Sequence, residues 1–246
     1  MRRIVLSALL LAAPLWAQAG GGAVPLDKAN IDLDNRQSLW HGAKLFVNYC
    51  MGCHSAQYMR YNRVGKDLGL SEDDLKQYLV FGEKKVGDTM TIAMRPEDAA
   101  RWFGTPAPDL SLVARSRGPD WLYTYLRTFY LDPKRPFGVN NLVFKDVAMP
   151  HVLWELQGWQ KPVYRTVKRA DGHEEKIIER LELAVPGKLS PAEYDKAVRD
   201  LVAFLTYVGE PAQFERKRLG PWVLAYLALL IVVFYVLKKE YWRDVH

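Results

Sequence analysis

The feature that most constrains this chain is the run Cys50-Met51-Gly52-Cys53-His54, whose two cysteines are the only ones in the sequence. A Cys-x-x-Cys-His run is typical of covalent haem attachment, in which both thiols add to the haem vinyl groups and the histidine lies under the iron. We therefore predict one covalently attached haem c, held by Cys50 and Cys53, with His54 as an axial ligand. We therefore expect the helices of this chain to pack around the flat haem group.

Other interpretations of this run are a chance match, a zinc half-site and a redox dithiol. A zinc site needs two further ligands of matching spacing, but the sequence has no second Cys pair and no paired His motif. A thioredoxin-like dithiol follows a strand and does not need a histidine. A disulfide would suit an oxidising compartment, yet the adjacent His54 favours haem.

The N-terminus has the composition of an export signal. Arg2 and Arg3 precede an apolar run, and Ala17-Gln18-Ala19 matches the small-residue pattern of a cleavage site before Gly20. A retained membrane anchor is the alternative, but the short apolar run and the small residues favour cleavage. We therefore predict that the mature chain is exported.

The C-terminus carries the second membrane signal. Residues 219–237 have no charged side chain, and crossing a bilayer takes about 20 apolar residues. Aromatic residues near both ends of this run are typical of interfacial anchors. A buried core helix is the alternative, and the basic clusters that flank the run argue against it.

These two signals predict a single-pass protein of the bacterial inner membrane, with its haem domain on the periplasmic side. The expected parts are a signal peptide (1–19), a periplasmic cytochrome c domain (20–211), a transmembrane anchor (212–238) and a cytoplasmic tail (239–246).

Charge argues against nucleic acid as a partner. Between Gly20 and Glu215 there are 26 Lys plus Arg and 26 Asp plus Glu, so the exported part is formally neutral and the net charge of +6 belongs to the membrane ends. The sequence also contains no Ser-His-Asp set, phosphate loop or metal-hydrolase motif. We therefore do not expect this chain to be an enzyme on its own.

Periodicity and capping signals predict a mainly α-helical domain with long loops. Residues 38–50 have apolar residues spaced to form one face of a helix, and the haem motif comes at the end of this helix. Further helix starts are expected at Ser71, Pro96, Pro119 and Ser190, the last with a capping-box glutamate and an end near Gly209 and Pro211.

One β-hairpin is expected in this domain. Residues 163–167 and 177–183 flank the turn signal Asp171-Gly172. Charged residues dominate the middle of this segment, which predicts a small exposed ribbon and not a core sheet.

The residues alone leave several candidates for the sixth iron ligand. A methionine thioether would favour ferrous iron and raise the reduction potential. Met149 is favoured because Pro150 biases its backbone to an extended conformation. Met51 and Met59 lie too close to the attachment loop. Met90 and Met94 lie in a loop that has no supporting turn residues. Histidine ligation is the rival. The histidine candidates are His41, His151 and His173.

Four blocks of the sequence, in order, resemble the cytochrome c1 family, the membrane-anchored haem subunit of quinol–cytochrome c reductase (complex III). The resemblance runs from about Gly42 to the C-terminus. The blocks are Gly42 through Tyr61 with Ser55 and Tyr58, Pro108-Asp109-Leu110-Ser111 followed by Arg115-Ser116-Arg117, Ala148-Met149-Pro150, and Arg216-Lys217-Arg218-Leu219-Gly220.

This resemblance implies roles for particular residues. It makes His54 and Met149 the axial ligands of the iron and places Pro108 at the haem. It makes Arg117 the partner of a haem propionate, with Arg115 as the alternative because the turn that follows is shorter than the family's usual Gly-Gly turn.

The resemblance also implies a function and partners. The chain would pass single electrons from a Rieske iron–sulfur protein to a soluble c-type cytochrome, within one membrane complex that also holds a cytochrome b. The family's acidic insertions around the haem edge are not evident here, so the docking surface for the soluble cytochrome is not assigned. Two alternatives stay open, a free-standing anchored shuttle or oxidase subunit, and a haem peroxidase or sensor.

Overall fold

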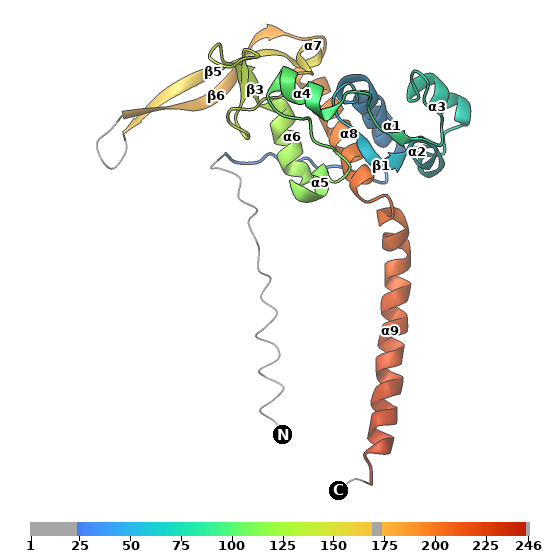
Figure 1. Cartoon of the computed structure of the whole chain (residues 1–246). Helices are drawn as coiled ribbons and strands as arrows, with labels where there is room; N and C mark the ends of the chain where they lie inside the picture. The colour runs from blue at the N-terminus through green and yellow to red at the C-terminus, as the bar shows by residue number, and fades with distance from the viewer. Residues whose placement is uncertain (1–23, 169–173, 245–246) are drawn as a thin grey trace.

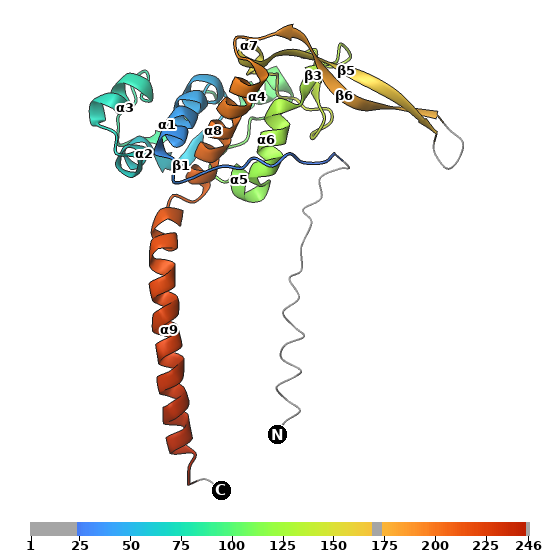
Figure 2. The same cartoon turned by 180° about the vertical axis from the view of Figure 1, so that it is seen from behind.

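The computed structural model describes residues 24–168 and 174–244. It shows a mainly helical domain from which a two-stranded ribbon and one long helix project in different directions (Figures 1 and 2). The predicted fold class, mainly α with a small hairpin and a C-terminal apolar helix, is confirmed. The predicted signal peptide and its cleavage site lie outside the described residues.

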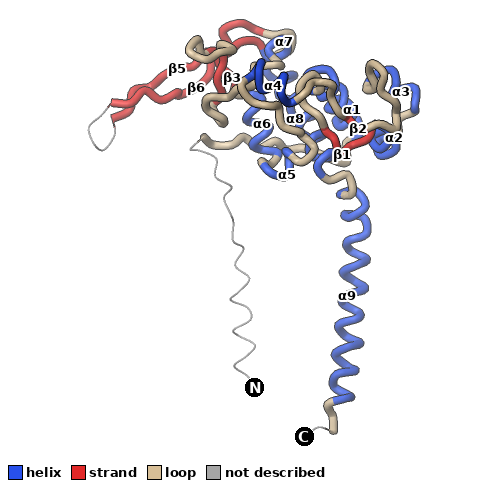
Figure 3. Tube along the Cα trace, in the orientation of Figure 1, coloured by secondary structure: helices blue, strands red, loops and turns tan. Residues whose placement is uncertain are grey.

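Helices and antiparallel pairs of strands are interspersed along the chain (Figure 3). The helical elements are α1 (Arg36–Leu45), the π-helical turn η1 (Phe46–Cys50), α2 (Tyr61–Leu68), α3 (Glu72–Tyr78), α4 (Pro96–Phe103), α5 (Val113–Ser116), α6 (Pro119–Arg127), α7 (Trp154–Gln157), α8 (Pro191–Gly209) and α9 (Gln213–Tyr241). Within the described residues the strand pairs are β1 (Ala56–Arg60) with β2 (Thr89–Met90), β3 (Phe129–Leu131) with β4 (Val139–Asn141), and β5 (Gly158–Lys168) with β6 (Glu174–Pro186).

The predicted helix over 38–50 is found as α1 followed by η1. The Asn35 side chain caps its start by accepting from the Ser38 amide. At its end, the Met51 amide donates to the Phe46 carbonyl at 3.0 Å, one residue farther back than in an α-helix. Such π-helical turns are frequent at functional sites, and here the turn delivers Cys50 to the interior.

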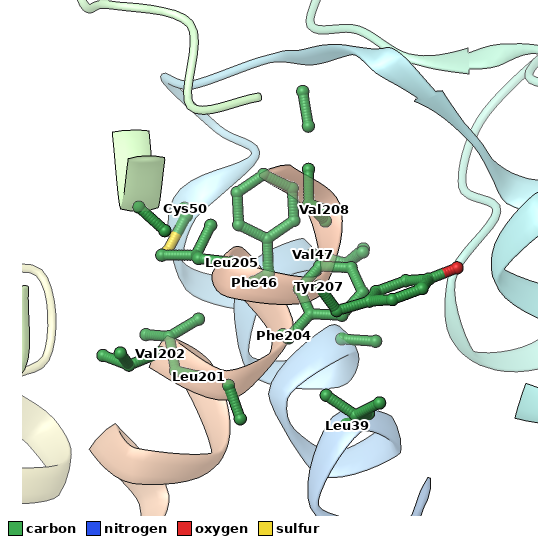
Figure 4. Close-up of a cluster of buried hydrophobic side chains, with 14 of the residues drawn as sticks. Leu39, Phe46, Val47, Cys50, Leu201, Val202, Phe204, Leu205, Tyr207 and Val208 are labelled. Atoms are coloured by element: carbon green, nitrogen blue, oxygen red, sulfur yellow. The ribbon is translucent and has the colours of Figure 1, made fainter. Parts of the chain in front are cut away.

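Helix α8 packs across α1 and forms the centre of the core. The capping box predicted at Ser190 is present, because its hydroxyl accepts from the Glu193 amide while the Glu193 carboxylate accepts from the Ser190 amide. The core cluster in Figure 4 joins α1 and η1 to α8, and the rings of Phe46 and Phe204 lie 5.7 Å apart. The two helices approach closely at Gly42, where a Cβ atom would lie 2.0 Å from the Asp200 carbonyl oxygen.

The other predicted helix starts are also found. Ser71 forms a second capping box at α3, Pro96 begins α4, and Pro119 begins α6. Gly104 ends α4 with a φ of +79°, a left-handed conformation that glycine adopts readily. Helix α6 ends at Arg127, and Phe129 follows it in β3.

The ribbon formed by β5 and β6 is longer than the sequence predicted and projects away from the helices (Figure 1). Apart from Gly158, none of its described residues is buried, as expected for an exposed ribbon. The predicted turn Asp171-Gly172 lies outside the described residues.

Helix α9 leaves the domain after α8, in agreement with the break expected at Gly209 and Pro211. Among the described residues it is the only helix long and apolar enough to cross a membrane, and none of its residues is buried. Its 29 residues span about 44 Å at 1.5 Å per residue, which exceeds the hydrocarbon core of a bilayer. Phe214 packs its ring against that of Tyr207 at the junction.

Candidate functional site

A large apolar cleft brings the predicted site residues together. Its empty volume is about 1310 Å³, which includes space open to solvent. The lining comes from the end of η1 and the motif that follows it, from the loop after α4, from α6, from the loop before α7, and from α8. Among its members are Cys50, Cys53, His54, Pro108, Arg117, Trp121, Tyr125 and Met149.

The two cysteines enter the cleft from a tight turn. The amides of Cys53 and His54 both donate to the Cys50 carbonyl, at 3.0 and 2.9 Å. Both thiols are free. Burial, with a smaller contribution from Cys53, raises the pKa of the Cys50 thiol to about 12. The turn therefore brings two free thiols and one imidazole to the cleft.

The imidazole of His54 is oriented by a residue far away in the sequence. Its Nδ1 lies 2.7 Å from the carbonyl oxygen of Pro108, so Nδ1–H donates and Nε2 remains available as the ligand atom. Burial lowers the pKa of His54, and the carbonyl of Pro108 partly offsets this. The neutral ring is the form that binds a metal.

The loop that carries Pro108 is tied to the haem motif by further hydrogen bonds. The Leu110 amide donates to the Ser55 carbonyl at 2.8 Å, and the Gln57 amide donates to the Asp109 carboxylate at 2.9 Å. The first and second blocks found in the sequence are thus in direct contact. Pro108 contributes a backbone carbonyl, a role that residue type alone does not indicate.

Met149 is the only methionine among the described residues that line the cleft. Its sulfur accepts a hydrogen bond from the Tyr125 hydroxyl at 3.3 Å. Met59 is buried in the core, and so is Met90, which lies in strand β2 and not in a loop as the sequence suggested. Met51 faces the hydroxyl of Tyr61, outside the cleft lining.

The rival histidines lie elsewhere. His151 is not in the cleft lining and stacks on Phe129, with ring centroids 5.0 Å apart. Burial lowers its pKa to about 4, although the Gly158 backbone and the Gln157 side chain partly offset this. His41 lies on α1 with Nδ1 3.6 Å from the Asp200 carboxylate. His173 lies outside the described residues.

The structure separates the two candidate arginines. Arg117 lines the cleft, with its guanidinium 5.2 Å from the centroid of the Trp121 ring. Arg115 is absent from the lining and pairs with Glu210 at 3.1 Å, at the end of α8. Only Arg117 is therefore placed to meet a group bound in the cleft.

Two further residues of the site were missed by sequence reasoning. Tyr125 was not identified as a partner of Met149. Asn141 is 1 % exposed, donates to the Tyr125 carbonyl at 2.7 Å, and accepts from the amides of Val143 and Phe144. The two adjacent asparagines inside an apolar stretch could have indicated this role, because buried side-chain amides need hydrogen-bond partners.

Comparison with known proteins gives the family. The model of the Cytochrome C1 family matches residues 28–174 and 188–245. The chain belongs to the cytochrome c1 family. It is 54% identical to a cytochrome c1 of Allochromatium vinosum over the full length of both chains. It is 48% identical to a Nitrosomonas europaea protein named ammonia monooxygenase gamma subunit, over all of this chain and 99% of that one. A cytochrome c1 of Rhodospirillum rubrum is 27% identical, over 99% and 97%.

Membership of the cytochrome c1 family makes this chain a haem electron-transfer subunit of a cytochrome bc1 complex, and so part of a membrane-bound respiratory oxidoreductase. The family implies a c-type haem, and the single apolar helix α9 suggests single-pass anchoring. The residues of the cleft fit this group. They provide two free thiols, an imidazole with a fixed Nδ1, a soft thioether and one guanidinium within apolar walls.

Proposed function

We propose that this chain binds one haem c through Cys50 and Cys53, with His54 and Met149 as axial ligands. The observation that carries this proposal is the meeting of both thiols, one imidazole and one thioether in a single apolar cleft, although Met149 is 95 residues away from His54 in the sequence. When bound, the haem supplies a one-electron couple.

The chain's own residues orient this group and set its potential. His54 is held by Pro108, so its Nε2 direction does not depend on the haem. A thioether from Met149 is a soft ligand that favours the ferrous form and raises the potential. If His54 and Met149 both held the iron, no position would be left for a substrate, which would favour electron transfer over peroxidase or sensor chemistry.

Arg117 is the proposed partner of a haem propionate. A guanidinium pairs with a carboxylate through two parallel hydrogen bonds and neutralises its charge. Arg117 lies at the cleft, whereas Arg115 is already paired with Glu210.

We further propose that electrons pass from a Rieske iron–sulfur protein through this chain to a soluble c-type cytochrome. The haem domain would lie on the periplasmic side, with α9 as the anchor and the residues after it in the cytoplasm. The export signal read from residues 1–19 supports this orientation. Family membership supports a cytochrome b as the neighbouring subunit.

The ligand assignment is tested by Met149→Leu in the full-length, haem-loaded protein. Covalent haem should be retained, the reduction potential should fall, and the reduced protein should bind carbon monoxide without denaturation. Met90→Leu, in the core and away from the cleft, is the matched control. An unchanged spectrum and potential in Met149→Leu would remove this residue from the iron.

The partners are tested by mild detergent extraction of native membranes. This chain should be recovered with a cytochrome b and a Rieske protein, and quinol should reduce its haem only while the Rieske centre is intact. Recovery as a lone monomer from membranes that keep quinol–cytochrome c reductase activity would favour the shuttle. Recovery with a monooxygenase, the activity named for the Nitrosomonas relative, would also overturn the assignment.

A further inference from the structure

We propose that Tyr125 is a positioning residue that donates a hydrogen bond to the sulfur of Met149 and thereby raises the reduction potential of the bound haem. The inference rests on the proposed role of Met149 as axial ligand. The contact itself is direct, because the Tyr125 hydroxyl oxygen lies 3.3 Å from the sulfur. Within the described part of the chain, Met149 is the only hydrogen-bond partner of this hydroxyl.

The Tyr125 ring is held in place on both sides. On one side it stacks on Trp121, with centroids 4.9 Å apart and planes at 11°. On another it meets the ring of Phe129 edge to face, at 5.1 Å and 67°. Both tyrosine and tryptophan project from α6, four residues apart, so they lie on the same helical face. The hydroxyl therefore has little freedom to leave the sulfur.

The backbone on each side of this contact is joined by Asn141. Its side-chain amide donates to the Tyr125 carbonyl at 2.7 Å, and its side-chain oxygen accepts from the amides of Val143 and Phe144 at 2.9 and 3.1 Å. One buried side chain thus ties the helix that carries the hydroxyl to the start of the loop that carries Met149. The donor and the acceptor are positioned relative to each other by protein contacts alone.

The expected effect follows from the chemistry of the thioether. A donor on sulfur draws electron density away from it, and the sulfur then donates less to ferric iron. The oxidised form loses more stabilisation than the reduced form, so the potential rises. Hydrogen bonds to ligand atoms are one of the means by which a protein tunes a haem or cluster.

The test is Tyr125→Phe in the full-length, haem-loaded protein, which removes one hydroxyl and keeps the ring stack. We expect the ratio of reduced to oxidised protein at fixed potential to fall by between about twofold and tenfold, where tenfold is about 59 mV for one electron. The sulfur-to-iron charge-transfer band of the oxidised protein should shift, because the sulfur becomes a better donor.

Tyr123→Phe is the matched control. Tyr123 lies on the same helix, is 4 % exposed, and has its ring under the guanidinium of Arg127 at 4.5 Å, outside the cleft lining. This change should leave both potential and band unaltered. Adding Tyr125→Phe to Met149→Leu should shift the potential much less than Tyr125→Phe does alone, since the sulfur is gone.

Each contrary result has a distinct meaning. An unchanged potential and band in Tyr125→Phe, with Met149→Leu still altering both, would overturn this inference and leave the ligand assignment standing. A lowered potential without a change in the band would place the hydroxyl on another group, such as a propionate, and would also overturn it. An unaltered spectrum in Met149→Leu would overturn the ligand assignment and this inference with it.

Discussion

The Nδ1 atom of His54 and the carbonyl oxygen of Pro108 lie 2.7 Å apart, although 54 residues separate them in the sequence. This contact fixes the plane of the imidazole before any group is bound. It joins the Cys-x-x-Cys-His motif to the block that begins at Pro108 and holds the proposed ligand in one orientation. Metal-binding histidines typically donate their other ring N–H to a carbonyl or carboxylate oxygen in this way.

The different surroundings of Arg117 and Arg115 predict different effects of the same substitution. Arg117→Gln should lower the reduction potential, because a positive charge beside the haem favours the reduced form. Its effect on the free energy of unfolding should be under about 1 kcal/mol, since Arg117 is exposed. Redox titration of the membrane-bound protein measures the shift.

Arg115→Gln is the control for this prediction, because its guanidinium pairs with Glu210 away from the cleft lining. Its potential should match that of the unmodified chain. Equal shifts from the two substitutions, or none from either, would contradict the assignment of Arg117 as the partner of a haem propionate.

Asn141 is expected to be important for stability. Asn141→Ala would remove the acceptor of two loop amides, Val143 and Phe144, and one of the two donors to the Tyr125 carbonyl, which also accepts from the Thr128 amide. Leaving a buried group unsatisfied costs about 1–3 kcal/mol. The free energy of unfolding should fall by more than about 2 kcal/mol, measured by urea titration of the haem-loaded protein. Asn48→Ala, at an exposed asparagine, should change it by less than about 0.5 kcal/mol.

Gly42 is predicted to tolerate no side chain. A Cβ there would lie 2.0 Å from the Asp200 carbonyl oxygen and 2.7 Å from the Phe204 Cβ, so α1 and α8 would have to separate. Gly42→Ala should lower the free energy of unfolding by about 3 kcal/mol or more, the upper part of the range for overpacking. Gly87→Ala is the matched change, since a Cβ at Gly87 meets no atom within 4 Å. Equal stability of the two variants would contradict the close packing at Gly42.

Helix α9 is predicted to be dispensable for haem binding, since none of its residues is buried. A stop codon after Glu215 should release a soluble haem-containing domain, detected by haem staining of the soluble fraction. A stop codon after Glu210 should give a less stable domain, because it also removes the ring of Phe214 from Tyr207. Loss of haem from the fragment that ends at Glu215 would show that the anchor contributes to the cleft.

Features that depend on near neighbours could be predicted well from the sequence. The capping boxes at Ser71 and Ser190 each join residues three positions apart, so their pattern is legible in the sequence and both were found. The apolar run that forms α9 could be predicted for the same reason, since its residues are consecutive in the sequence. The π-helical turn at Phe46 was not predicted, because it depends on where α1 has to deliver Cys50 against the core.

By itself, the sequence determined that this chain has one Cys-x-x-Cys-His motif, a set of amphipathic helices and one apolar C-terminal helix. It left several methionines and histidines as candidates for the sixth ligand, and two arginines for the propionate. Only the tertiary structure decided which of them line the cleft, and it alone joined His54 to Pro108 and Tyr125 to Met149. The reason is physical: local patterns reflect the backbone's own periodicity, whereas these contacts form between segments that meet only when the helices pack.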